Sequence, residues 1–195
     1  LDEPTTGLDP QRDEVLFVSA LAMHRSGGRW SVVAQDSLDL LIRPRAVVTS
    51  AENVLVHGLG LGVQSRGTSP AQALLMLRQW VADSPVLAFH ADFDRSFLSQ
   101  ACKRERLEPM PWHWLDIADV LPIVFPKIQA QTLDQWMAVL NVPCSRRHHA
   151  AADAWATAQL WLLMVQSVPG QQQMQWRQWR QFVKQGRWLS GRLIL

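Results

Sequence analysis

Hydrophobic and polar residues alternate along this chain with two periods, first that of strands and then that of helices. An apolar run within Asp13–Met23 and a β-branched, alternating stretch at Trp30–Ile42 predict two strands. The Ser-Gly-Gly sequence at 26–28 predicts a hairpin turn between them. Short apolar runs at 85–90 and 112–116 predict two further strands, and the first of these carries no charge, as is typical of a central strand.

The remaining apolar residues recur at helical spacing. Ser69 and Pro70 are a serine N-cap followed by a proline in the first helical position, and both are typical of a helix start. Further helices are predicted at 92–106, 117–125, 132–140 and 148–165, with a short helix or turn at 50–57. A hairpin followed by strands that alternate with helices predicts an α/β domain with a sheet of mixed direction.

Composition limits the class of protein. With 195 residues and 48% hydrophobic residues, the chain is large and apolar enough for one globular domain with a sizeable core. Cys102 and Cys144 lack metal-ligand spacing, which indicates free thiols in a reducing compartment and predicts a cytoplasmic location. No apolar run has the length of a membrane span, and the first residues do not form a signal peptide, so no membrane partner is expected.

The C-terminal segment, residues 169–195, is predicted to be a basic helical extension of a domain that covers residues 1–168. Trp176, Trp179 and Val183 follow helical spacing in a stretch rich in Gln and Arg, and no Asp or Glu follows Asp153. Three interpretations are open: a nucleic-acid strand lies on the basic face with bases on tryptophan, the apolar stripe docks on the domain, or a partner binds. The docked helix with a solvated basic face is favoured.

Residues 146–160 join basic and imidazole side chains to an alanine-rich helix. Asp153 is its only acidic residue and lies among small apolar neighbours, where an unpaired carboxylate is costly unless a metal or a cation relieves it. His148 precedes Asp153 by five residues, so the two do not share a helix face. A movable imidazole beside a fixed carboxylate suits a general base next to a metal-bound carboxylate. The alternative is a packing helix with surface histidines at its start.

Two more carboxylates occupy positions where site residues are expected. Asp94 follows the strand at 85–90 at its C-terminal edge, the usual ligand-binding edge of an α/β sheet. Asp2 lies on or just after an expected first strand. Together with Asp153, these give three carboxylates that one sheet edge could gather. Such hard oxygen ligands suit Mg²⁺ or Mn²⁺ and not zinc.

These motifs together resemble the DnaQ-like 3′–5′ exonucleases, the DEDDh group that includes the proofreading subunit of bacterial DNA polymerase III. The matching segments occur in the family's order and cover residues 1 to about 166: they are 2–16, 55–59, 88–94, 114–116 and 148–154. The resemblance implies a ribonuclease-H-like mixed five-stranded sheet flanked by helices. It also implies hydrolysis of single-stranded DNA or RNA from its 3′ end with release of nucleoside 5′-monophosphates. A polymerase subunit or a second copy of the chain is the implied protein partner.

The resemblance also implies the roles of individual residues. Asp2, Asp94 and Asp153 would hold two Mg²⁺ or Mn²⁺ ions, and His148 would deprotonate the attacking water. The substrate-binding positions, most of which fall where the family lines its terminal-nucleotide pocket, are Thr5, Thr6, Gly7, Leu8, His57 and Phe93. Asp116 is expected to be structural, and His90 replaces the family's usual Asn.

One position departs from the family. The second carboxylate, a Glu two residues after the first Asp, falls on Pro4, whose side chain has no ligand atom. Glu3 is adjacent, but neighbouring side chains of a strand point to opposite faces, so Glu3 reaches the metal only through a bulge or a slipped register. Only Leu1 precedes Asp2, so a truncated or mis-started N-terminus is also expected. The alternative function is therefore a weakened or inactive exonuclease-like domain that binds nucleic acid or a polymerase.

Residues 1–10 also resemble the Walker B motif and D-loop of an ABC transporter ATPase. In that interpretation Asp2 would serve Mg²⁺ and Glu3 would polarise water. Such an ATPase requires a P-loop of the form G-x-x-x-x-G-K-[ST], and the nearest candidate, 62–68, has Thr68 in place of the lysine. The exonuclease interpretation is therefore preferred over the whole chain.

Overall fold

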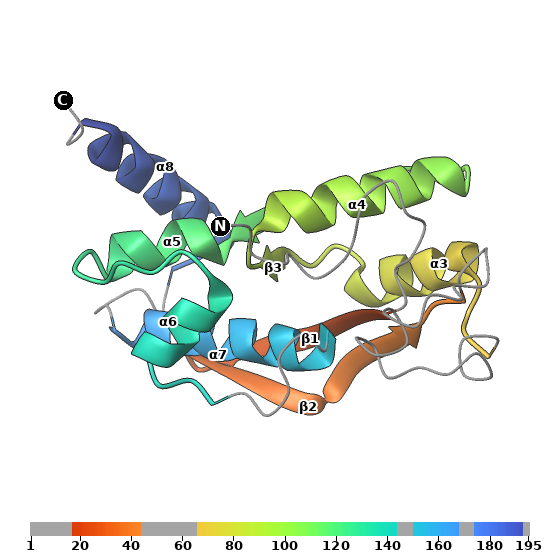
Figure 1. Cartoon of the computed structure of the whole chain (residues 1–195), viewed down its shortest axis with the longest axis horizontal. Helices are drawn as coiled ribbons and strands as arrows, with labels where there is room; N and C mark the ends of the chain where they lie inside the picture. Colours follow the sequence, from red (N-terminus) through yellow and green to blue (C-terminus); the bar gives the residue numbers. More distant parts are fainter. Residues whose placement is uncertain (1–16, 44–65, 144–149, 168–173, 193–195) are drawn as a thin grey trace, which may run out of the picture.

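A computed structural model describes residues 17–43, 66–143, 150–167 and 174–192 (Figure 1). Its strands are β1 (Phe17–Ser26), β2 (Arg29–Leu41), β3 (Val86–Ala88) and β4 (Trp114–Asp116). Its helices are α3 (Pro70–Val81), α4 (Ala91–Arg104), α5 (Ile117–Val124), α6 (Leu133–Val139), α7 (Ala150–Ser167) and α8 (Trp176–Arg192). None of the helices in these ranges is long and apolar enough to cross a membrane.

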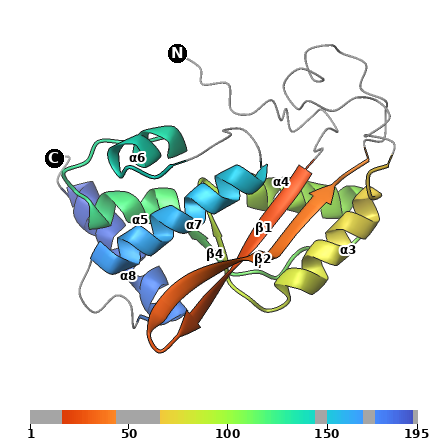
Figure 2. The same cartoon turned by 90° about the horizontal axis from the view of Figure 1, so that it is seen from below.

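The predicted hairpin is confirmed as the antiparallel pair β1–β2. Gly27 and Gly28 both have positive φ angles, 55° and 80°, which the tight turn of a twisted hairpin requires and which glycine adopts without strain. The register changes between Leu21, paired with Ser37, and Met23, paired with Val32. The hairpin therefore contains a bulge, and Figure 2 shows that it curves strongly along its length.

The second sheet is the parallel pair β3–β4, in which Val86, Leu87 and Ala88 pair with Trp114, Leu115 and Asp116. The mixed α/β class predicted from the sequence agrees with this structure. The predicted single five-stranded sheet is not found, because the described strands form two separate two-stranded sheets. Four of the five predicted strands are present, whereas the strand expected near Asp2 and the helix or turn at 50–57 lie outside the described residues.

Local signals explain where the helices begin and end. The Ser69 hydroxyl accepts a hydrogen bond from the Gln72 N–H (3.4 Å) at the start of α3, as expected for an N-cap. Thr132 caps α6 in a complete capping box with Gln135. The predicted helix 92–106 ends at Arg104, because Arg106 adopts the left-handed conformation and Leu107 donates its N–H to the Cys102 carbonyl.

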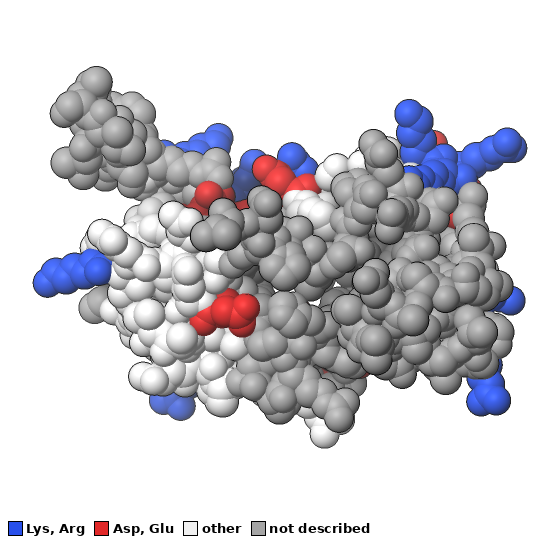
Figure 3. Space-filling view, viewed as in Figure 1, with Lys and Arg blue, Asp and Glu red and all other residues white. Residues whose placement is uncertain are grey.

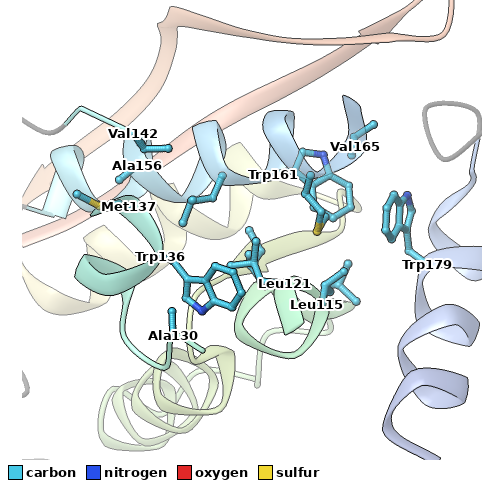
Figure 4. Packing of buried hydrophobic residues seen from close by; sticks show 14 of the residues in the cluster. Leu115, Leu121, Ala130, Trp136, Met137, Val142, Ala156, Trp161, Val165 and Trp179 are labelled. Carbon is cyan, nitrogen blue, oxygen red and sulfur yellow. The ribbon is translucent and has the colours of Figure 1, made fainter. Parts of the chain in front are cut away.

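Two hydrophobic clusters form the interior. The tryptophan cluster packs α5, α6, α7 and α8 together (Figure 4), and its largest fully buried side chains are Trp136, Trp161 and Trp179. The α3–α4 cluster consists of Leu74, Leu77, Val81, Leu98, Cys102 and Trp112. Cys102 is thus a buried, free packing residue, as expected, and burial raises the pKa of its thiol.

The C-terminal helix α8 belongs to the tryptophan cluster. The Trp179 side chain is 0% exposed, and its ring lies 4.7 Å from that of Trp161 between centroids. Trp161 in turn meets Trp30 of β2 edge to face at 5.9 Å. Arg177 and Arg180 of the same helix are exposed. The predicted docked helix is therefore present, whereas the domain boundary at 168/169 remains a prediction.

Candidate active site

The first candidate ligand, Asp94, lies in the first turn of α4. β3 ends at Ala88, the chain turns at His90 in the left-handed conformation (φ 62°), and α4 begins at Ala91. The Asp94 side chain is half-buried. Burial raises the pKa of Asp94 to about 6. A hydrogen bond that the carboxylate accepts from the Asp94 backbone N–H lowers this pKa and opposes part of the effect. The negative charge of Asp116 raises this pKa further, and His90 lowers it.

Asp116 lies beside this turn at the end of β4. Its carboxylate accepts hydrogen bonds from three backbone N–H groups, those of His90 (3.0 Å), Ala91 (2.9 Å) and Ala118 (2.9 Å). Asp116 thus caps α5 and at the same time holds the start of α4. The expected structural role agrees with these contacts. The bonds from His90 and Ala91 span 26 and 25 residues of the chain, so only the cap on α5 has a local sequence signal.

Acidic and basic residues separate along α4. Asp92 and Asp94 stand in its first turn, and Lys103 and Arg104 stand in its last, which complements the helix dipole. On the face seen in Figure 3, acidic side chains lie above the starts of α4 and α5, and Lys and Arg gather at the upper right around the end of α4. Asp92 differs from Asp94, because its side chain is 89% exposed and pairs with Arg95 at 3.0 Å.

The second candidate ligand, Asp153, lies in the first turn of α7. Helical spacing places it in line with the buried residues Ala156, Thr157 and Leu160, at the N-terminal end of the face that packs inward. Its side chain is half-buried. A carboxylate at this position has the chemistry expected of a ligand to a hard cation.

The other predicted site residues lie outside the described residues, so their roles stay predictions. These are Asp2, Glu3, Thr5, Thr6, Gly7, Leu8, His57 and His148. Phe93 is described, and its side chain is 40% exposed next to Asp94. Within the described ranges, no three His, Cys, Asp or Glu side chains form a group that could hold a metal ion. Asp94 and Asp153 fit a divalent cation by chemistry, but they do not complete a site by themselves.

The sequence matches the Exonuclease family over residues 1–161. The chain therefore belongs to the exonuclease family, which confirms the resemblance to the DnaQ-like exonucleases inferred from the motifs. The match includes residues 1–10, the stretch that also resembles an ATPase motif.

Curated relatives are DNA polymerases of the PolC type. The chain is 28% identical over 170 residues to DNA polymerase III PolC-type of Thermotoga maritima and 23% identical over 167 residues to that of Bacillus cereus. These matches cover 86% of this chain but only 12% and 11% of the two polymerases. The chain therefore corresponds in length to a small part of each.

Solved exonucleases share the fold. Exonuclease X in complex with 5′ overhanging duplex DNA has a TM-score of 0.60 at 15% identity, with 85% of this chain and 90% of that chain covered. A 3′-exonuclease that recognises the 3′ end of a histone mRNA stem-loop has a TM-score of 0.59 at 14% identity, with 77% and 82% covered. These likenesses support the ribonuclease-H-like fold.

Proposed function

We propose that this chain is a metal-dependent 3′–5′ exonuclease that releases nucleoside monophosphates from single-stranded ends. The observation that carries the proposal is Asp94, a half-buried carboxylate with a pKa raised to about 6, placed where β3 leads into α4. A carboxylate that burial makes costly to ionise is typical of a position where a bound cation offsets the charge. Membership of the exonuclease family supports the hydrolysis of phosphodiester bonds.

The proposed site combines described residues with the predicted ones. Asp94 and Asp153, together with Asp2, would hold two Mg²⁺ or Mn²⁺ ions. These ions would supply positive charge at the scissile phosphate. His148 would take the proton of the attacking water as a general base. The exposed ring of Phe93 offers an apolar surface next to Asp94 against which a terminal base can stack.

The substrate and the partner are proposed from the relatives. The PolC-type polymerases favour DNA and an association with a replicative polymerase, whereas the fold neighbours include proteins bound to duplex DNA and to an mRNA stem-loop. A cytoplasmic location remains part of this proposal. The second candidate function, a weakened or inactive domain that binds nucleic acid or a polymerase, rests on Pro4 at the position of the family's second carboxylate.

The decisive experiment is metal-dependent degradation of a labelled single strand of DNA or RNA. With a 5′ label, we expect a ladder that shortens from the 3′ end in Mg²⁺ or Mn²⁺, and none in EDTA. Asp94→Ala should abolish the ladder. Asp92→Asn is the matched control on the same helical turn, because Asp92 is exposed and pairs only with Arg95 among the contacts described, and it should retain activity.

Other outcomes would change the assignment. Release of labelled mononucleotide from the 5′ end would refute the polarity. Binding of the strand by folded wild-type protein without cleavage in either metal would favour the second candidate function, and Pro4→Glu should then restore cleavage.

A further inference from the structure

We propose that Asp116 is a positioning residue, whose carboxylate holds the first turn of α4, and with it Asp94, by accepting the backbone N–H groups of His90 and Ala91. The inference rests on the proposed function for its catalytic consequence. The contacts themselves are independent of that function, because they join Asp116 to the main chain at 2.9–3.0 Å.

The start of α4 needs such support. Its N-cap residue, His90, makes no side-chain capping hydrogen bond, so the helix lacks the usual local acceptor for its first N–H groups. His90 also adopts the left-handed conformation, which is strained for a residue with a Cβ atom. Asp116 of β4 supplies an acceptor for two of these N–H groups, those of His90 and Ala91, and a charged oxygen makes a stronger hydrogen bond than a neutral one.

Among the described residues, the pairing of β3 with β4 stops before this turn. The β3–β4 ladder has three residue pairs and ends where Ala88 pairs with Asp116. The carboxylate continues the connection beyond the ladder, to the second and third residues after Ala88. Ala91 is nearly fully buried, at 4% exposed, so its N–H has little access to water as a replacement acceptor.

The two carboxylate oxygens of Asp116 accept different hydrogen bonds, so substitutions can test these bonds separately. Oδ1 accepts from His90 and from Ala118, the latter being the cap of α5, and Oδ2 accepts from Ala91. A serine at this position retains one oxygen, which can cap α5 but cannot bind both His90 and Ala91. An asparagine retains the shape and one carbonyl oxygen, so it should preserve part of the connection.

The experiment compares Asp116→Ser and Asp116→Asn with Thr132→Ala in the full chain. The Thr132 hydroxyl caps α6 by accepting a hydrogen bond from the Gln135 N–H at 3.2 Å. Thr132→Ala removes this cap and therefore serves as the control for a purely structural loss of a helix cap. The readouts are kcat and KM on a labelled single strand, thermal unfolding, and amide hydrogen exchange at His90, Ala91 and Ala118.

We expect Asp116→Ser to lower kcat by about 10-fold or more, as is typical when a residue that orients a ligand is lost, with KM changed less. Exchange at His90 and Ala91 should accelerate while Ala118 stays protected. Asp116→Asn should recover part of the loss, and Thr132→Ala should lower the unfolding temperature without lowering kcat. If Asp116→Ser does not fold, Asp116→Asn provides the same comparison.

Two results would overturn the inference. One is an equal kcat for Asp116→Ser and Thr132→Ala. The other is unchanged exchange at His90 and Ala91 in both Asp116 variants. An inactive wild-type chain would refute the proposed function and the catalytic consequence together, and amide exchange would still show whether Asp116 holds α4.

Discussion

Replacement of Asp94 by asparagine should stabilise the protein at neutral pH while abolishing its activity. The native state raises the pKa of Asp94 from 3.8 to about 6, chiefly through burial, so it binds a proton more tightly than the unfolded chain does. A carboxyl group with a raised native pKa contributes its full stabilisation at pH values below its pKa in the unfolded chain. This contribution is lost as the pH rises through its pKa in the native state. The loss should therefore occur between about pH 4 and 6.

The size of the effect follows from the same values. A rise from 3.8 to about 6 corresponds to a cost of about 3 kcal/mol for ionising Asp94 in the folded protein. Because the side chain is only half-buried, water and local relaxation reduce this cost, and we expect about 1–3 kcal/mol. Asp94→Asn retains the shape and hydrogen-bonding capacity of the side chain, so it should remove mainly the charge.

The assay is urea unfolding in EDTA at several pH values from 4 to 8. The free energies of unfolding of wild type and Asp94→Asn should coincide near pH 4 and diverge up to pH 6, with the variant more stable above that. Asp92→Asn, on the exposed side of the same turn, should follow the wild-type pH dependence. Parallel curves for wild type and Asp94→Asn across the whole range would refute the inferred cost of ionisation.

Two further predictions concern the packing of α8. Trp179→Ala should lower the free energy of unfolding by about 3–5 kcal/mol, because it removes a fully buried aromatic ring beside Trp161, whereas Trp155→Ala, at a side chain 40% exposed, should cost much less in the same urea titration. Gly186→Ala should cost about 1–3 kcal/mol, because its Cβ would overlap the side chain of Ile123, and Ile123→Ala in the same chain should relieve part of that cost.

Local structure could be predicted because its causes lie within a few residues. Ser69 and Thr132 begin helices through side chains that reach their own first turns, and the two glycines at 27–28 permit the hairpin turn. The ends of helices were less predictable. The left-handed conformation of Arg106 stops α4 at Arg104. The residue type does not predict it, because arginine rarely adopts a positive φ angle.

Features that depend on distant segments could not be predicted. The alternating pattern of Trp30–Ile42 indicates one regular strand, yet the pairing register changes within it, and the two halves of the hairpin pack on different clusters. For the candidate site, the positions of Asp94 and Asp153 near the starts of helices follow from the sequence. The hydrogen bonds from His90 and Ala91 to Asp116 do not, because they join β4 to a turn 26 and 25 residues earlier.

The two described candidate ligands stand on helices that pack in different hydrophobic clusters. Asp94 stands on α4, which packs in the α3–α4 cluster, and Asp153 stands on α7, which packs in the tryptophan cluster. Figure 1 shows α4 in the upper half of the view and α7 in the lower half. The hairpin contributes to both clusters, with Val18 in one and Met23 and Trp30 in the other. Its bulge lies between these positions. Packing at the hairpin, far from either carboxylate in sequence, therefore contributes to the relative placement of α4 and α7.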